Sequence, residues 1–336
     1  MIKIDGSAGE GGGQVLRTAL GLSLVTGQPF QIDNIRAKRR KPGLMRQHLT
    51  AVRAASEIGS AKTTDAEIGS GSLQFVPKKV SSGNYHFSIG TAGSCTLVFQ
   101  AVLPALLTAD EPSEIILEGG THNPMAPPFN FLEKTFMPIL RKMGVGVDAV
   151  LDRPGFYPAG GGRIRVVIHP VQKLKAIELV EADDVSFSAM AVCAQLPSHI
   201  AERELRVVKE KLGLRDDDME LVKLEKQGPG NIVSIFGQSK EVTETFTGFG
   251  EKNVKAEKVA LKAVKQARDY VEAGVPVGKY LADQLVVPMA LAGSGRFLTC
   301  KPTEHTLTNI NVISNFLDCY INLEQVGEKI WEVTVS

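Results

Sequence analysis

The stretch GEGGGQVLR at residues 9–17 combines residue types that bind phosphates. Its glycines let the backbone approach an anion closely, and N–H groups at the start of a following helix can face the charge. Glu10 adds a carboxylate for a metal ion. The stretch fits neither G-x-x-x-x-G-K-[S/T] nor G-x-G-x-x-G followed by an acidic residue. A permissive turn without function therefore remains an open alternative.

A basic run, RAKRRKPGLMRQH, occupies residues 36–48. No acidic residue lies between Asp33 and Glu57, so the cations have no local partner. An arginine fork binds two phosphate oxygens at once, which makes the run a candidate site for a phosphate or an RNA backbone. A solvated basic loop is the alternative. The cations are Arg36, Lys38, Arg39, Arg40, Lys41 and Arg46.

Two other stretches hold residues of chemical interest. His305, in PTEHTLTN, follows the predicted strand RFLTC, and loops after strands often carry function. A single histidine is nevertheless more often structural or exposed. THNPMAPPFNF at residues 121–131 is either a rigid connection before a helix or a surface on which a base stacks.

The elements that must position these residues show an internal repeat. IDGSAG at residues 4–9 and SIGTAG at 88–93 each turn out of a strand-like stretch into an apolar helix. In each copy a second helix then ends in glycine, at 46–59 and 131–144. The two copies are about 85 residues apart. Glycine at both helix ends predicts left-handed caps, because glycine accepts that conformation.

A third copy is interrupted. Its two helices are predicted at 280–293 and 308–318, and a closing hairpin with its turn at Gly327 follows at 321–336. The predicted fold class is α+β, with three repeated units that each pair two helices with a small mixed sheet. The predicted domains are a large one made of 1–180 and 276–336 and a smaller inserted α/β domain at 181–275.

Composition limits the class of protein. The 336 residues are 43% hydrophobic and 22% charged, with a net charge of +1, so any basic surface must be local. The four cysteines are far apart and form no C-x-x-C pair, which argues against a zinc knuckle or a disulfide framework. We found no signal sequence and no apolar run of about 18 residues. We therefore expect a reduced, cytoplasmic protein that is not in a membrane.

Across essentially the whole chain, the motifs resemble those of the RNA 3′-terminal phosphate cyclase family. They are GEGGGQVLR, RAKRRKPGLMRQHLTAV, GTAGSCTLVFQ, GGTHNPMAPP, GFYPAGGG, QGPGN, YLADQLVVPMALAG and HTLTN. The resemblance implies ATP-dependent conversion of an RNA 3′-phosphate to a 2′,3′-cyclic phosphodiester, with release of AMP and pyrophosphate. It implies RNA with a 3′-phosphate as partner and Mg²⁺ or Mn²⁺ as metal. It also implies three repeats similar to the C-terminal domain of a translation initiation factor, plus an inserted α/β domain.

The same resemblance assigns roles to individual residues. The family's reaction adenylates a histidine, passes AMP to the RNA 3′-phosphate and closes the ring with the 2′-hydroxyl, and its histidine corresponds to His305. Glu10 would hold the metal. The phosphate contacts would be Arg17, Arg36, Arg39 and Gln47. The nucleotide pocket would comprise Gln100, Pro127, Phe131, Tyr280, Leu281, Ala282, Asp283 and Gln284, with Tyr280 and Pro127 on opposite faces of adenine.

Three other functions are open to a chain with these motifs. A non-catalytic homologue that binds RNA in ribosome assembly would lack the histidine and the arginines, yet this chain has His305, Arg17 and Arg39. An enolpyruvyl-type transferase would share the repeat unit but leaves HTLTN and YLADQ unexplained. A plain RNA-binding module would need no covalent histidine. The oligomeric state stays open, with a homodimer among the options.

Overall fold

The first 80 residues build a four-stranded sheet and two helices. The computed structural model describes all residues, 1–336. β1 and β2 run parallel, and β4 is antiparallel to both β2 and β3, in the order β1-β2-β4-β3. The elements are β1 (Ile2–Asp5), α1 (Gln14–Thr26), β2 (Phe30–Asp33), α2 (Arg46–Ile58), β3 (Lys62–Thr64) and β4 (Leu73–Val76).

The second sheet has the order β5-β6-β8-β7, with one parallel and two antiparallel pairs. Alternation fixes its register, because Ile164, Val166 and Ile168 of β8 are all buried while the residues between them face outward. The elements are β5 (Asn84–Ser88), α3 (Cys95–Leu106), β6 (Ser113–Gly119), α4 (Phe129–Phe131), the π-helical turn η1 (Leu132–Phe136), α5 (Met137–Lys142), β7 (Gly146–Arg153) and β8 (Gly162–His169).

The third sheet, β15-β16-β14-β9, also has one parallel and two antiparallel pairs. The predicted closing hairpin is confirmed as β15 and β16. The last predicted helix is shifted, because α9 begins at Glu304 rather than at residue 308 and therefore includes His305. The elements are β9 (Glu178–Leu179), α8 (Lys279–Ala292), β14 (Gly295–Thr299), α9 (Glu304–Ile313), β15 (Ile321–Gln325) and β16 (Trp331–Val335).

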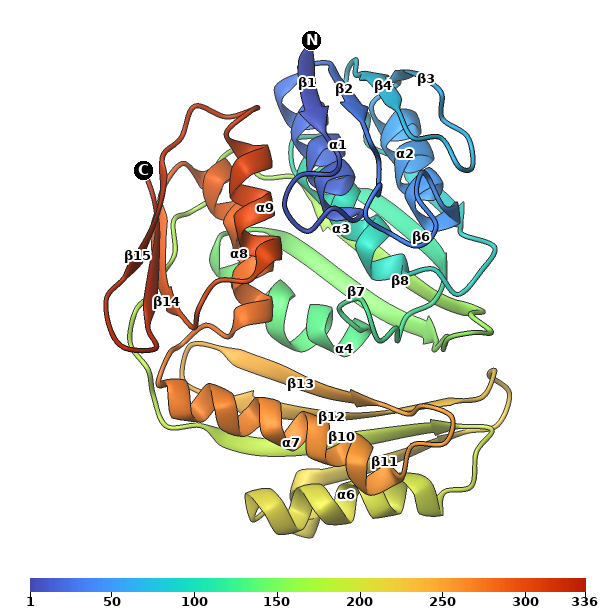
Figure 1. Cartoon of the computed structure of the whole chain (residues 1–336), viewed down its shortest axis with the longest axis vertical. Coiled ribbons are helices and arrows are strands. Elements are labelled where there is room, and N and C mark those ends of the chain that lie inside the picture. The colour runs from blue at the N-terminus through green and yellow to red at the C-terminus, as the bar shows by residue number, and fades with distance from the viewer.

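The chain between β9 and α8 forms a fourth sheet with its own core. The order is β11-β10-β12-β13, and 17 buried residues between residues 189 and 275 pack under α6 and α7. Figure 1 shows this segment as a separate layer below the rest. Its elements are β10 (Ser186–Ala194), α6 (His199–Leu212), the 3₁₀ turn η2 (Asp216–Asp218), β11 (Met219–Leu224), β12 (Gly230–Gln238), β13 (Thr243–Phe249) and α7 (Ala256–Ala273).

One predicted helix cap is wrong. Gly27 and Gly293 end α1 and α8 in the left-handed region, at φ of 69° and 73°. Gly144 also has a positive φ. Gly59, however, has a φ of −96°, so conformational freedom does not explain it. A Cβ at Gly59 would collide with Leu24, so glycine is present because α1 and α2 approach closely there.

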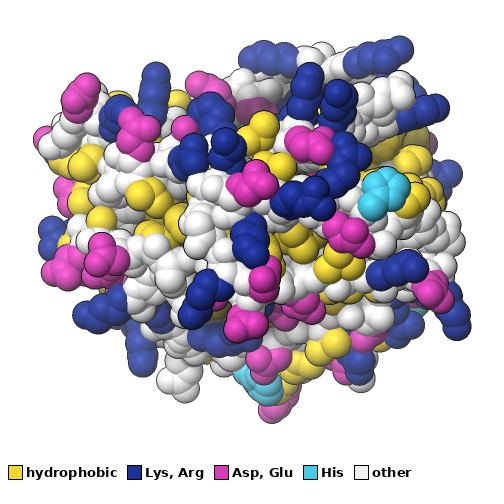
Figure 2. Space-filling model, turned by 90° about the horizontal axis from the view of Figure 1, so that it is seen from below, with side chains coloured by type: hydrophobic (Ala, Val, Ile, Leu, Met, Phe, Trp, Pro, Cys, Tyr) yellow, Lys and Arg dark blue, Asp and Glu magenta, His cyan; other side chains and the backbone are white.

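Helices from different sheets meet in the middle of the molecule. α1 packs against α3 and α9, and α8 packs against α9, so the three sheets surround a shared core of 63 buried residues. Together, helices and mixed sheets confirm the α+β class. Every helix is too short or too polar to span a lipid bilayer. On the face viewed from the α6 and α7 side, basic and acidic side chains are interleaved (Figure 2).

Candidate active site

His305 lies in the first turn of α9. Thr303 is the N-cap residue, and its hydroxyl oxygen accepts the N–H groups of His305 and Thr306 at 3.1 and 3.3 Å. Such a cap satisfies helical N–H groups that otherwise have no partner. Nδ1 of the imidazole is shielded from solvent and makes no hydrogen bond. Since the side chain lines a cavity, Nε2 is the nitrogen that a substrate can reach.

Asp283 joins α8 to this turn. Its side chain is buried, and Oδ1 accepts the hydroxyl groups of Thr303 and Thr306 at 2.5 Å each. Burial raises the pKa of Asp283, while the two hydrogen bonds and the neighbouring His305 act in the opposite direction. The carboxyl group thus holds the turn that carries the histidine.

Asn309 connects α9 to α1. Its Nδ2 donates to the carbonyl oxygen of Asp283 at 2.8 Å. Its Oδ1 accepts from Gln14 at 2.9 Å and from Thr18 at 2.7 Å. These bonds hold the two helices in one register, and as a result Arg17 of α1 and His305 of α9 line the same cavity.

Arg17 is a buried cation without an acidic partner. Only 9% of its surface is exposed, and its guanidinium donates to Oε1 of Gln14 at 2.8 Å. Burial, followed by the charge of Arg36, lowers the pKa of Arg17 to about 10. A protein tolerates a buried charge of this kind when it is to be neutralised by a ligand, so Arg17 is well suited to an anion.

Some arginines of the predicted basic loop make hydrogen bonds or ion pairs within the protein. Nη1 of Arg36 donates to the carbonyl oxygens of Lys41 and Gly43 at 2.8 Å each, which closes the loop. Arg39 forms an ion pair with Oε1 of Glu10. The loop therefore folds over the glycine stretch, as a clamp requires.

Gly12 and Gly13 are needed because polar and charged side chains lie directly against them. A Cβ on Gly12 would lie within 3.0 Å of the Glu10 carboxylate and of the Arg39 guanidinium. A Cβ on Gly13 would lie within 3.0 Å of the His48 ring and of Nη1 of Arg17. The glycine stretch is thus the surface on which the cationic groups converge.

His48 and His305, the two histidines near these arginines, are neutral at physiological pH. Burial first, and then the charges of Arg17, Arg36 and Arg39, lower the pKa of His48 to about 3. Burial, Arg17 and Arg39 also lower the pKa of His305, against the opposing effect of Asp283. A neutral imidazole has a free lone pair, so His305 is in the form that acts as a nucleophile.

The cavity beside His305 has a volume of about 260 Å³. Seven predicted site residues line it: Arg17, Pro127, Phe131, Tyr280, Asp283, Gln284 and His305. The lining combines proline and aromatic side chains with polar and charged groups, which suits a ligand with a flat ring and a charged end. The fourth sheet also contributes, through Thr245, Thr247 and Phe249 of β13.

The remaining predicted residues do not line this cavity. Gln100 is hydrogen-bonded to Gln284. Oε1 of Gln47 accepts the N–H of Ser94, the N-cap of α3, at 2.7 Å. Leu281 and Ala282 are fully buried in the core, so their side chains cannot touch a ligand in the cavity.

Several residues of the site escaped sequence reasoning. His48 lies in a stretch that was interpreted through its arginines. Asn309 is the last residue of the HTLTN motif, and no role was assigned to it. For Thr245 and Thr247 no local signal exists, since they reach the cavity only because the fourth sheet packs against α4 and η1.

Glu10 is the one predicted metal ligand. No group of three or more His, Cys, Asp or Glu side chains is placed to hold a metal. Oε2 of Glu10 is nevertheless buried without a hydrogen-bond partner, which leaves it available to a cation. A single carboxylate suits a metal that takes its other ligands from nucleotide phosphates and water.

Comparison with known proteins places the chain in a family. The family "RNA 3′-terminal phosphate cyclase" matches residues 8–323. A protein of that name from Koribacter versatilis is 52% identical over 94% of this chain and 90% of its own length. Those from Ectopseudomonas mendocina and Pseudomonas fluorescens are each 48% identical over 99% of this chain and 97% of their own.

Among solved structures, the enolpyruvyl transferase NikO from Streptomyces tendae aligns with 99% of this chain and 48% of its own, at a TM-score of 0.38 and 10% identity. That likeness is too slight to bear on fold or function. The family match and the identity of the relatives are decisive instead, and the chain belongs to the RNA 3′-terminal phosphate cyclase family.

Proposed function

We propose that this protein is an ATP-dependent RNA 3′-terminal phosphate cyclase that works through a histidine–AMP intermediate. The family and the relatives' names support the activity. The observation that carries the mechanism is the placement of a neutral histidine, His305, in one cavity with the buried cation Arg17.

The reaction begins on His305. Nε2 attacks the α-phosphorus of ATP, a P–N bond forms, and the bond to the bridging oxygen breaks to release pyrophosphate. A 3′-phosphate oxygen of RNA then attacks the same phosphorus, and the P–N bond breaks to restore the imidazole. The adjacent 2′-hydroxyl attacks the 3′-phosphorus, loses its proton and expels AMP. Proximity favours this last closure.

The other residues bind and orient. Arg17, Arg36 and Arg39 supply positive charge for the phosphates of ATP and of the RNA end, and Gln47 supports the turn beside them. Tyr280 and Pro127 enclose adenine, with Phe131 and Gln284 completing the pocket. A Mg²⁺ or Mn²⁺ ion held by Glu10 and the nucleotide would neutralise phosphate charge. Because Glu10 pairs with Arg39, Arg39 must leave it for a phosphate when the nucleotide binds.

We further propose that the first three sheets are copies of one unit. In support, each is built from strand, helix, strand, helix and two strands, and each orders its strands first-second-fourth-third. The large domain would comprise 1–180 and 276–336, and 181–275 would be an insertion. The four free cysteines suit a reducing, cytoplasmic setting.

Labelling with ATP tests the mechanism. ATP labelled at the α-phosphate should leave an acid-labile, base-stable label on the denatured protein, and His305→Ala should abolish it. RNA with a 3′-phosphate should be cyclised, whereas RNA with a 2′-deoxy end should stop at the adenylated form. If the wild type takes up no label yet binds RNA, the protein is the non-catalytic homologue instead.

A further inference from the structure

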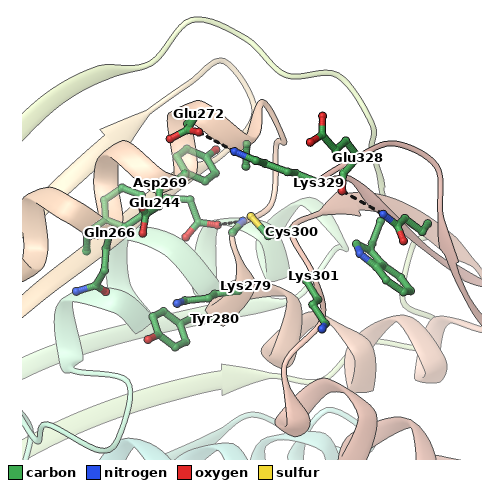
Figure 3. Close-up of a pocket in the computed structure, with 16 residues that line it drawn as sticks. Glu244, Gln266, Asp269, Glu272, Lys279, Tyr280, Cys300, Lys301, Glu328 and Lys329 are labelled. Atoms are coloured by element: carbon green, nitrogen blue, oxygen red, sulfur yellow. Dashed lines mark hydrogen bonds and ion pairs between the residues drawn. The ribbon is translucent and has the colours of Figure 1, made fainter.

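Tyr280 forms a partition between two cavities. It lines the cavity beside His305 and also a second one of about 630 Å³. The second cavity lies between β13 and α7 on one side and the start of α8, the end of β14 and the β15–β16 hairpin on the other (Figure 3). Tyr280 is 47% exposed, so packing alone does not fix its ring.

Lys279 supports the ring from the second cavity. Its Nζ lies 4.9 Å from the centroid of the Tyr280 ring, within the range of a cation–π interaction. Lys279 lines the second cavity but not the one beside His305. The ammonium group therefore contacts the Tyr280 ring from the side of the second cavity (Figure 3).

Glu244 anchors the start of α8 from the same side. Only 2% of this residue is exposed, and its Oε1 accepts the N–H of Gly278, the N-cap of α8, at 2.6 Å. Burial raises the pKa of Glu244 to about 8, and the neutral acid still offers a carbonyl oxygen to that N–H. A Cβ on Gly278 would lie 2.9 Å from Oε1, so contact between the two segments is close.

The residue after Glu244 connects the same strand to the cavity beside His305. Thr245 lines the cavity beside His305, and its hydroxyl group is hydrogen-bonded to that of Thr135 at 2.8 Å. A single strand, β13, therefore forms part of the cavity wall and also holds the helix start that carries Tyr280.

We propose that Lys279 and Glu244 are positioning residues that hold Tyr280 as the wall against which the nucleotide's base stacks. Through Glu244, the segment inserted between β9 and α8 would set the affinity for ATP. The proposal rests on the proposed function, because it assumes that adenine occupies the cavity beside His305.

The expected effects follow from the interactions removed. Lys279→Met should raise the KM for ATP in His305 labelling about threefold, as for one partly exposed cation–π contact, with the maximal rate unchanged. Lys279→Arg should restore the wild-type KM. Glu244→Ala should raise the KM about tenfold, since it leaves a buried N–H without an acceptor. Glu244→Gln keeps an acceptor and should reverse most of that effect.

Base preference separates positioning from general damage. The uracil ring of UTP is smaller than adenine and gains less from stacking on Tyr280. Lys279→Met should therefore lower the ratio of labelling with ATP to labelling with UTP. Lys301→Met is the matched control, because Lys301 lines the same cavity but makes no cation–π interaction with Tyr280. Lys301→Met should leave the KM for ATP and the preference for ATP over UTP unchanged.

The variants also distinguish the two proposals. If Tyr280→Ala raises the KM for ATP but Lys279→Met behaves as Lys301→Met does, the support by Lys279 is refuted and the proposed function stands. If Tyr280→Ala leaves the KM unchanged while His305 is still labelled, Tyr280 is not the wall and the inference fails. If His305 takes up no label at all, the proposed function itself fails.

Discussion

Replacing Arg17 with methionine should stabilise the protein while it impairs nucleotide transfer. Methionine fills a similar volume along the buried stem but has no charge to desolvate. The side chain is 9% exposed, and burial is the main cause of its lowered pKa. Without bound phosphate, the folded protein therefore bears a cost that the ligand would remove.

The magnitude follows from the pKa. Arginine ordinarily titrates near 12.5, and the pKa of Arg17 is lowered to about 10. At 1.36 kcal/mol per pH unit, the buried charge costs about 3 kcal/mol. Loss of the hydrogen bond to Gln14 offsets about 1 kcal/mol. We expect Arg17→Met to raise the free energy of unfolding by about 2 kcal/mol.

Urea unfolding and adenylation measure the two effects separately. The unfolding midpoint should rise with an unchanged slope, and the rate of His305 labelling should fall about 100-fold. Arg206→Met, at an exposed position on α6, is the control and should change neither. A lower midpoint for Arg17→Met would refute the reasoning, because it would make Arg17 a structural cation. Unchanged labelling would remove Arg17 from the phosphate site.

Two further predictions concern pH and the glycine stretch. The pKa values of His48 and His122 are lowered to about 3 and about 4, so the folded state binds fewer protons than the unfolded state, in which histidine titrates near 6.5. Stability should consequently fall as the pH drops from about 6.5 to about 4, by up to ~1.4 kcal/mol per pH unit for each histidine. The slope of urea midpoint against pH should become shallower in His122→Gln, and an unchanged slope would contradict the lowered pKa of His122. Gly13→Ala should abolish His305 labelling, because its Cβ would displace His48 and Arg17, whereas Gly71→Ala, with open space around it, should label normally.

Periodicity and turn chemistry were enough to predict several helices and the final hairpin. The two early helix pairs, the helix at 280–293 and the final hairpin were all visible as local patterns, because apolar spacing and glycine punctuation are properties of short segments. The errors have local causes too. Gly59 was misread because a glycine required by helix contact has the same sequence signature as one required by a left-handed cap.

The site was harder to predict, because its geometry depends on contacts between distant segments. Glu10, Arg17, Arg36, Arg39 and His305 could be named from motifs, yet nothing local indicated that His48 would be buried among the arginines. Leu281 and Ala282 entered the predicted pocket because they lie within YLADQ, although helix geometry turns them into the core. A contiguous motif therefore overstates how many of its residues face the ligand.

A polar network links His305, the proposed nucleophile, to Arg17 of the proposed phosphate site. From α1, Gln14 and Thr18 bond to Asn309 of α9, which bonds to the backbone of Asp283, whose carboxyl group bonds to the cap of α9. Apolar contacts are not directional, but each of these hydrogen-bonding groups would lose its partner if the helices shifted. In the proposed mechanism the transfer of AMP needs His305 and Arg17 on the same phosphate, so a network that penalises a shift of α1 against α9 favours that transfer.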